Sequence, residues 1–173
     1  MAPAPPADRA AQRALVERFA RERPASVLYD AAGSALLDVA SGKTLALDWA
    51  RVALVEERRD AAGGRPYVAI RLDGGREIAL SDAGVAFAPA TAATGPLEGL
   101  PRAVCFRDLA GAEARLDHFL AHHPDEPPAR EHVALFLFCL AVVDGARAAG
   151  FDVSPEERRL ERLLAGLEAR RRG

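Results

Sequence analysis

The spacing of apolar residues changes twice along the chain and divides it into three parts. After a Pro- and Ala-rich flexible tail at 1–7, residues 8–23 repeat apolar positions every three or four residues, which predicts a helix. Residues 26–88 carry short apolar runs between turn residues, which is typical of an antiparallel meander. Residues 108–172 return to the helical period, with a break at 124–127. This order predicts an α+β fold.

Six to eight short strands are expected in the meander and directly after it. The expected strands are Val27–Asp30, Ala35–Ala40, Thr44–Asp48, Val52–Arg59, Pro66–Leu72, Glu77–Ser81, Val85–Phe87 and Ala103–Phe106. The clearest pair is the hairpin around Asp73-Gly74, two residues that suit a tight turn. Val68 and Ile70 share one face of its first strand, and Ile78 faces the same way on the return strand.

Three helices are expected after the meander. The first spans 108–123, and the other two form a helical hairpin at 128–173 that follows a linker at 124–127. Gly150 suits the left-handed residue that ends the first helix of the hairpin. Ser154 starts the second helix with the spacing of a capping box, a hydroxyl followed three residues later by a glutamate.

The order of elements favours one architecture for the first part of the chain. Residues 8–123 would form an α+β domain in which the strands build a small bent barrel, closed at one end by the 108–123 helix. This order resembles the pleckstrin-homology-like superfold. The resemblance is topological and rests on no motif, so the ligand it implies is a peptide, a lipid headgroup or none. Phosphoinositide binding would require a basic cluster in the first hairpin, where Lys43 stands nearly alone.

The first helix of the hairpin is unusually apolar. Val133 to Val143 is an unbroken apolar run of 11 residues, apolar on every side of a helix. A membrane span needs about 20 such residues, so we expect no membrane span and a cytoplasmic location. The run must then be covered by the sheet, by the second helix of the hairpin, by a partner or by a second copy.

Composition narrows the functional classes. The formal net charge is -2, which argues against a general nucleic-acid binder. The chain has 38 alanines, and 22 arginines against a single lysine, a bias that indicates a bacterial genome of high GC content. Cys105 and Cys139 each lie in an apolar run without metal-ligand spacing, so we expect buried free thiols.

No catalytic constellation is evident, and no cofactor is expected. The glycine pairs fall in hairpin turns, and no serine lies in a nucleophile-elbow motif. His118 and His122 have the i, i+4 spacing with which two imidazoles bind one metal ion from a helix face. The nearest acids that could complete such a site are Asp125 and Glu126. The alternative for this histidine pair is a solvated polar face.

Large apolar side chains are the remaining candidates, as contact residues of an interface. The candidates are Trp49, Tyr67, Phe136, Phe138, Leu160, Leu163 and Leu167. With free sheet edges and the apolar helix, they predict a non-enzymatic protein–protein interaction or adaptor module, with a protein partner or as a homo-oligomer. The alternatives are a small ligand-binding domain or enzyme whose pocket forms no motif, and a metal-binding domain.

Overall fold

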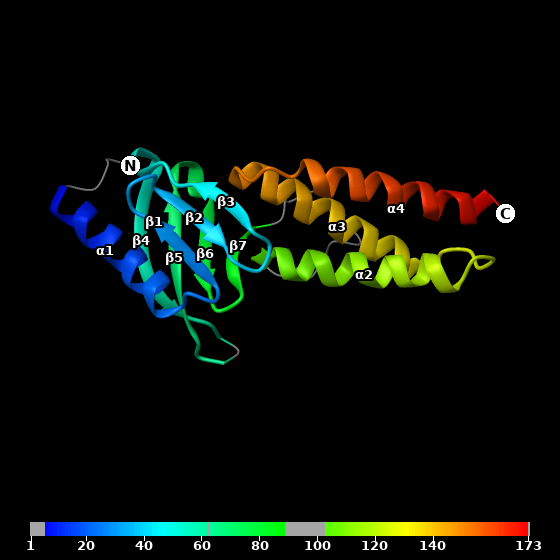
Figure 1. Ribbon diagram of the computed structural model, residues 1–173, viewed down its shortest axis with the longest axis horizontal. Helices are drawn as coiled ribbons and strands as arrows, with labels where there is room; N and C mark the ends of the chain where they lie inside the picture. Colours follow the sequence, from blue (N-terminus) through cyan, green and yellow to red (C-terminus); the bar gives the residue numbers. More distant parts are fainter. Residues whose placement is uncertain (1–5, 62, 89–102, 173) are drawn as a thin grey trace.

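The computed structural model of the 173-residue chain describes residues 6–61, 63–88 and 103–172. Its α-helices are α1 (Pro6–Glu22), α2 (Phe106–His122), α3 (Arg130–Ala149) and α4 (Ser154–Arg172). Its strands are β1 (Val27–Asp30), β2 (Ala35–Asp38), β3 (Lys43–Ala46), β4 (Val52–Arg59), β5 (Pro66–Leu72), β6 (Glu77–Ser81), β7 (Gly84–Phe87) and β8 (Val104–Cys105). Figure 1 shows α1 and the strands at one end of an elongated molecule, with the other helices extending from them. The predicted α+β class is confirmed.

The strands form two antiparallel sheets that do not close into one barrel. β1, β2 and β3 make the first sheet in that order, and β4 to β8 make the second, each beside its neighbour in sequence. The break falls at a short 3-10 turn, Trp49–Arg51, where the Asp48 carboxylate accepts a hydrogen bond from Ala50 N at 3.0 Å. The chain turns there, so β3 and β4 enter different sheets. The meander is confirmed, whereas the closed barrel and the pleckstrin-homology-like topology are not.

The hairpin of β5 and β6 follows the predicted register. Val68 lies opposite Leu80, and Ile70 lies opposite Ile78, so all four side chains point to one face of the sheet. Gly74 occupies the turn with φ 80°, a conformation that glycine adopts without strain. This alternation of buried and partly exposed residues gives the second sheet one strongly apolar face.

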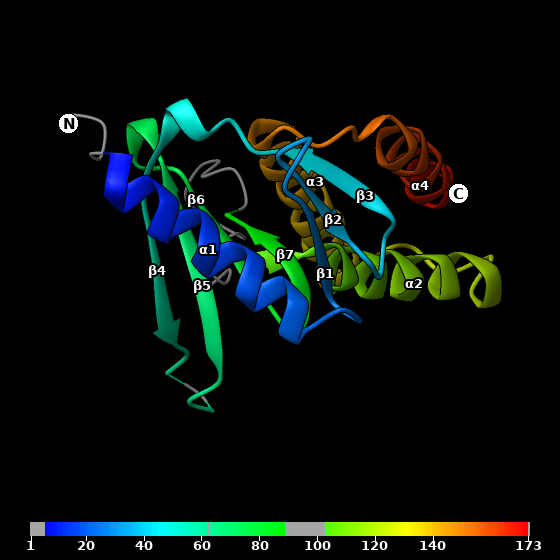
Figure 2. The same cartoon turned by 60° about the vertical axis from the view of Figure 1, so that its left-hand side comes forward.

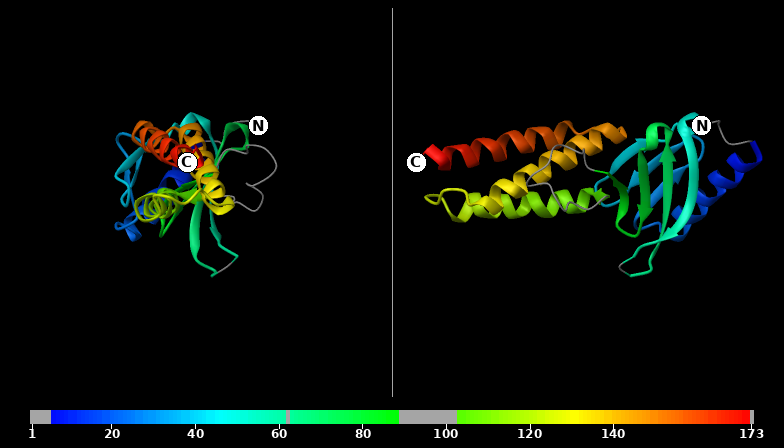
Figure 3. Two further views of the ribbon diagram at one scale, coloured as in Figure 1. Left: turned by 90° about the vertical axis from the view of Figure 1, so that its right-hand side faces the viewer. Right: turned by 180° about the vertical axis from the view of Figure 1, so that it is seen from behind.

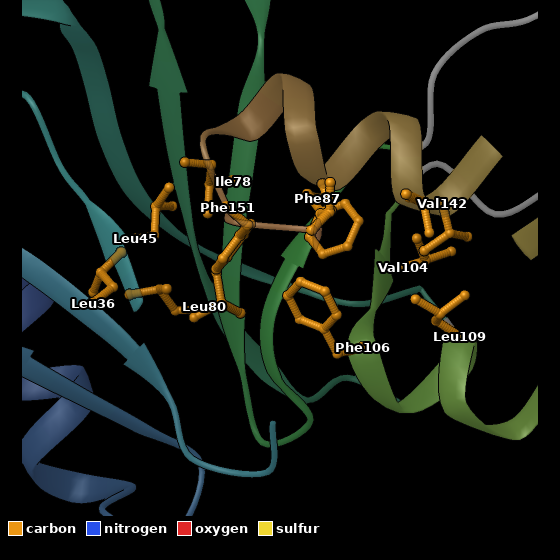
Figure 4. Packing of buried hydrophobic residues seen from close by; sticks show 14 of the residues in the cluster. Leu36, Leu45, Ile78, Leu80, Phe87, Val104, Phe106, Leu109, Val142 and Phe151 are labelled. Atoms are coloured by element: carbon orange, nitrogen blue, oxygen red, sulfur yellow. The ribbon is translucent and has the colours of Figure 1, made fainter. Parts of the chain in front are cut away.

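The apolar faces of the two sheets pack against each other. Leu36 and Leu45 of the first sheet meet Ile78 and Leu80 of the second in one buried cluster (Figure 4).

Helix α1 contacts β1 of the first sheet and β4 and β5 of the second, and Figure 2 shows it lying across the strands. It begins at Pro6, two residues earlier than expected, so it includes the end of the tail predicted at 1–7, of which residues 1–5 lie outside the described ones.

Three phenylalanines join the sheets to the helices. Phe87 of β7, Phe106 of α2 and Phe151, between α3 and α4, have ring centroids 5.0–5.6 Å apart. Figure 4 shows them between the sheet residues and the helix residues of the core. The single lysine, Lys43 of β3, adds an ion pair to the buried Glu156 of α4 at 2.9 Å. One continuous core therefore links the two ends of the molecule.

Helices α2, α3 and α4 form a bundle, which we call the helical bundle. Both α3 and α4 contact α2, and Figure 3 shows the three helices running side by side away from the sheets. The helix that was expected to close a barrel is therefore mainly a bundle helix, anchored to the sheets at its start.

Gly150 ends α3 with φ 108°, as predicted. The capping box at Ser154 is not formed, because the backbone N–H of Ser154 donates to Asp152 Oδ1 at 3.0 Å and that of Glu157 donates to the Val153 carbonyl at 2.9 Å. The division into parts at 8–123, 124–127 and 128–173 stays a prediction.

Candidate functional site

The outward side of α3 carries apolar residues that the described part of the chain leaves exposed. Val133 is 47% exposed and Leu140 is 40% exposed, and the half-buried Leu137 lies between them on the same face. These positions have the i, i+4, i+7 spacing of a helix–helix contact seam. We call Val133, Leu137 and Leu140 the outer stripe of α3.

The opposite side of α3 explains why the outer stripe faces outward. Cys139, Val142, Val143 and Ala146 are buried among the core residues of the bundle and the sheets. A helix packed on one side against two neighbours has room for only one buried face. Because α3 is apolar all round, its remaining apolar residues stay at the surface.

Charged residues limit the outer stripe at its sheet-proximal end. Asp144 continues the spacing of the stripe and forms an ion pair with Arg147 at 2.8 Å. Arg147 also pairs with Glu157 of α4. Leu164 of α4 is a further exposed leucine of the bundle. The bundle thus offers an apolar surface that ends at a charged edge.

By length and composition alone, α3 is also apolar enough to cross a membrane. Only 33% of its most apolar stretch is buried within the described chain. Core helices of soluble proteins meet the same criterion. The expectation of no membrane span therefore stays a prediction.

The predicted interface residues fall into two groups. Those buried inside the chain are Trp49, Leu160, Leu163 and Leu167, and those half-buried are Tyr67, Phe136 and Phe138. The three leucines lie together on one face of α4 in the core of the bundle. Trp49 lies far along the chain from them and donates its Nε1 hydrogen bond to the Tyr29 hydroxyl at 3.0 Å. The structure does not bring these seven residues together at one surface.

The sequence did not single out Val133 and Leu140, although it singled out the run that contains them. In a run that is apolar on every side, no periodicity distinguishes the face that neighbours will cover. The signal that could have found them is the charged Asp144 and Arg147, which continue the outward face after the apolar run ends.

The four histidines lie around α2 and the start of α3. The rings of His118 and His122 stack with centroids 4.2 Å apart, and His122 Nδ1 lies 3.0 Å from the His118 carbonyl oxygen. No group of three or more potential metal ligands occurs among residues 6–61, 63–88 and 103–172. His118, His123 and His132 instead line a shallow hollow of about 350 Å³ between α2 and α3.

A buried ion pair connects α2 to α4. Glu113 is buried and accepts a hydrogen bond from Arg159 at 2.6 Å, while its Oε1 has no partner among the described residues. Burial raises the pKa of Glu113, and the Arg159 guanidinium opposes that rise. Burial also raises the pKa of the Cys139 thiol to about 12, with the Glu113 charge contributing. Both cysteines are buried free thiols, as predicted. These groups bear on stability and give no sign of nucleophile activation.

No protein-family model, curated protein or solved structure matches the chain.

Proposed function

We propose that the chain is a non-enzymatic interaction module of the bacterial cytoplasm, which binds a protein partner or a second copy through the outer stripe of α3. The observation that carries this proposal is the exposure of Val133 and Leu140 on a helix whose opposite face is packed in the core. Scattered apolar residues are normal on a protein surface, but a row at helical spacing suits a partner helix.

The organisation of the helical bundle also supports this proposal. The outer stripe belongs to a helix that ends at Gly150 beside the sheets and packs on α2 and α4. Such a surface is preorganised, so little conformational entropy is lost when a partner binds.

The finer architecture, a bent barrel of pleckstrin-homology-like topology, belongs to the proposal as well. Its support is that the two antiparallel sheets pack face to face around one core. An experimental structure in which β3 hydrogen-bonds to a strand of the second sheet would establish closure, and a gap there would refute it.

Light scattering after size-exclusion chromatography, at several concentrations, tests the self-association form. Leu140→Lys introduces a charge into the outer stripe, and Leu28→Lys is the matched control, because Leu28 is 44% exposed on β1. We expect concentration-dependent association that Leu140→Lys abolishes and Leu28→Lys leaves unchanged.

Pull-down from a lysate of the source organism tests the partner form with the same variants. A partner that wild type and Leu28→Lys retain and Leu140→Lys loses supports the proposal. A chain that is monomeric at every concentration and retains no protein in a Leu140-dependent manner contradicts both forms.

A further inference from the structure

We propose that the hollow between α2 and the start of α3 binds a small organic anion that carries a flat apolar group. This inference is independent of the proposed function. The hollow measures about 350 Å³, near the lower end of ligand pockets, so it suits a small molecule. Its lining residues are Ala114, Arg115, His118, Phe119, His123 and His132.

The lining concentrates imidazoles that are rare elsewhere in the chain. Of the four histidines in the sequence, three line the hollow, and the fourth, His122, stacks on His118. His132 comes from α3 and the others from α2 or its end, so the fold brings them together. Among the described residues, no carboxylate belongs to the lining itself, although Glu126 and Glu131 lie beside two of its histidines. Imidazole and guanidinium groups together favour an anion.

Arg115 supplies the fixed positive charge of the hollow. The two nearest acids on its helix, Glu113 and Asp117, pair with arginines of α4 at 2.6 and 3.9 Å. The Arg115 side chain is exposed at the edge of the hollow. Its guanidinium can therefore donate two parallel hydrogen bonds to a carboxylate.

Two of the histidines have defined orientations. The backbone N–H of Ala129 donates to His132 Nδ1 at 3.0 Å, so the hydrogen of the neutral ring lies on Nε2. Glu131 lies 3.8 Å from that Nε2. His123 Nδ1 lies 3.0 Å from a carboxylate oxygen of Glu126, which fixes its ring. His132 Nε2–H is thus the donor that this ring can offer to an anion from the other helix, in competition with the Glu131 carboxylate.

Stacked rings provide the apolar side of the hollow. The Phe119 ring is nearly parallel to that of His132, with centroids 3.8 Å apart, and to that of His123, with centroids 5.7 Å apart. Flat surfaces of this kind suit an aromatic or other planar apolar group. The N–H donors would thus bind the charged group of the ligand, and the rings would contact its planar apolar group.

Histidine ring signals in NMR titrations test the proposal with three probes. Benzoate has both features, benzamide has the ring without the charge, and inorganic phosphate has the charge without the ring. We expect benzoate to shift the signals of His118 and His132 and to bind about tenfold more tightly than either other probe. Equal affinity for benzamide, or no shift at millimolar benzoate, overturns the proposal.

Two arginine variants separate the hollow from general surface charge. Arg115→Ala should weaken benzoate binding about tenfold, whereas Arg107→Ala, an exposed arginine of α2 outside the hollow, should not weaken it. Both side chains are exposed, and circular dichroism checks that both variants fold. Equal effects of the two substitutions would refute the assignment.

Discussion

The two sheets and the helical bundle differ in how completely they bury their apolar residues. In β5 and β6 the side chains of Val68, Ile70, Ile78 and Leu80 are almost fully buried. In α3, Val133 and Leu140 remain substantially exposed. A strand assigns alternate residues to opposite faces, so β5 and β6 place alanines, Arg71 and Glu77 on the other face. Helix α3 is apolar on every face, so it has more apolar surface than its neighbours cover.

Removing a ring from the join between the two regions should have the largest effect. Phe87→Ala leaves a cavity beside Phe106 and Phe151 and should lower the free energy of unfolding by about 3–5 kcal/mol. Urea unfolding followed by circular dichroism and by Trp49 fluorescence measures it. If the two transitions coincide, the sheets and the bundle unfold together. Separate transitions would show instead that they are independent domains.

The control for Phe87→Ala is a substitution in the helical bundle, at a less buried phenylalanine. Phe136→Ala removes a ring of the same size from a half-buried position of α3. We expect a loss of about 1–2 kcal/mol, because less of that ring leaves water on folding. Equal losses for the two substitutions would contradict the contrast in burial.

The ion pair inside the bundle should have the next largest effect. Arg159→Ala leaves the buried Glu113 carboxylate without its partner and should cost about 2 kcal/mol at pH 7. Because the pKa of Glu113 is raised, the folded chain binds the proton of this carboxyl group more tightly than the unfolded chain does. The stabilisation that comes from protonated Glu113 is therefore complete below pH 4.5, the ordinary pKa of a glutamate. This stabilisation is lost as the pH rises through the raised pKa.

Urea unfolding at a series of pH values checks the direction of this pH dependence. The cost of Arg159→Ala should shrink as the pH falls toward 4.5, where Glu113 becomes neutral. Glu113→Gln should flatten this part of the profile and make Arg159→Ala nearly neutral in the double variant. An equal cost at both ends of the series would contradict the role of the Glu113 charge.

The two cysteines allow a smaller effect to be measured in each region. Burial raises the pKa of both thiols, so at pH 8 alkylation requires local opening. Cys105 lies in the two-residue edge strand β8, whereas Cys139 lies in the middle of α3. We expect iodoacetamide to modify Cys105 about tenfold faster, as measured by peptide mass spectrometry. Faster modification of Cys139 would show that the exposed stripe marks a loosely packed helix.

The smallest effect is expected at the outer stripe itself. Leu140→Lys should change the free energy of unfolding of the monomer by no more than about 0.5 kcal/mol, because lysine suits an exposed helix position. Thermal unfolding at low protein concentration measures it. A large loss would mean that Leu140 packs within its own chain and has no surface to offer a partner.

Local patterns predicted most of the secondary structure but not its assembly. The β5–β6 register follows from alternation and an Asp-Gly turn, both of which act within a few residues. The break between the sheets depends on the turn Trp49–Arg51, which lies between two expected strands and contains no Gly or Pro to indicate a change of sheet. The placement of α2 in the bundle depends on contacts with residues far along the chain, such as Arg159.

The candidate surfaces were predicted less well, for the same reason. The hollow joins residues of α2 to His132 of α3, so no spacing in the sequence reveals it. The metal spacing of His118 and His122 was visible, but one ring stacks on the other instead of converging with it on a third ligand.

The ion pair of Lys43 has a practical consequence for studying the joint between the two regions. Lys43 provides the only side-chain amine in the sequence, and its side chain is 15% exposed while it pairs with Glu156. An amine-reactive reagent therefore has one side-chain target, located where the first sheet meets α4. The rate at which that amine is acylated would report how often the bundle separates from the sheet, without a substitution or an attached probe.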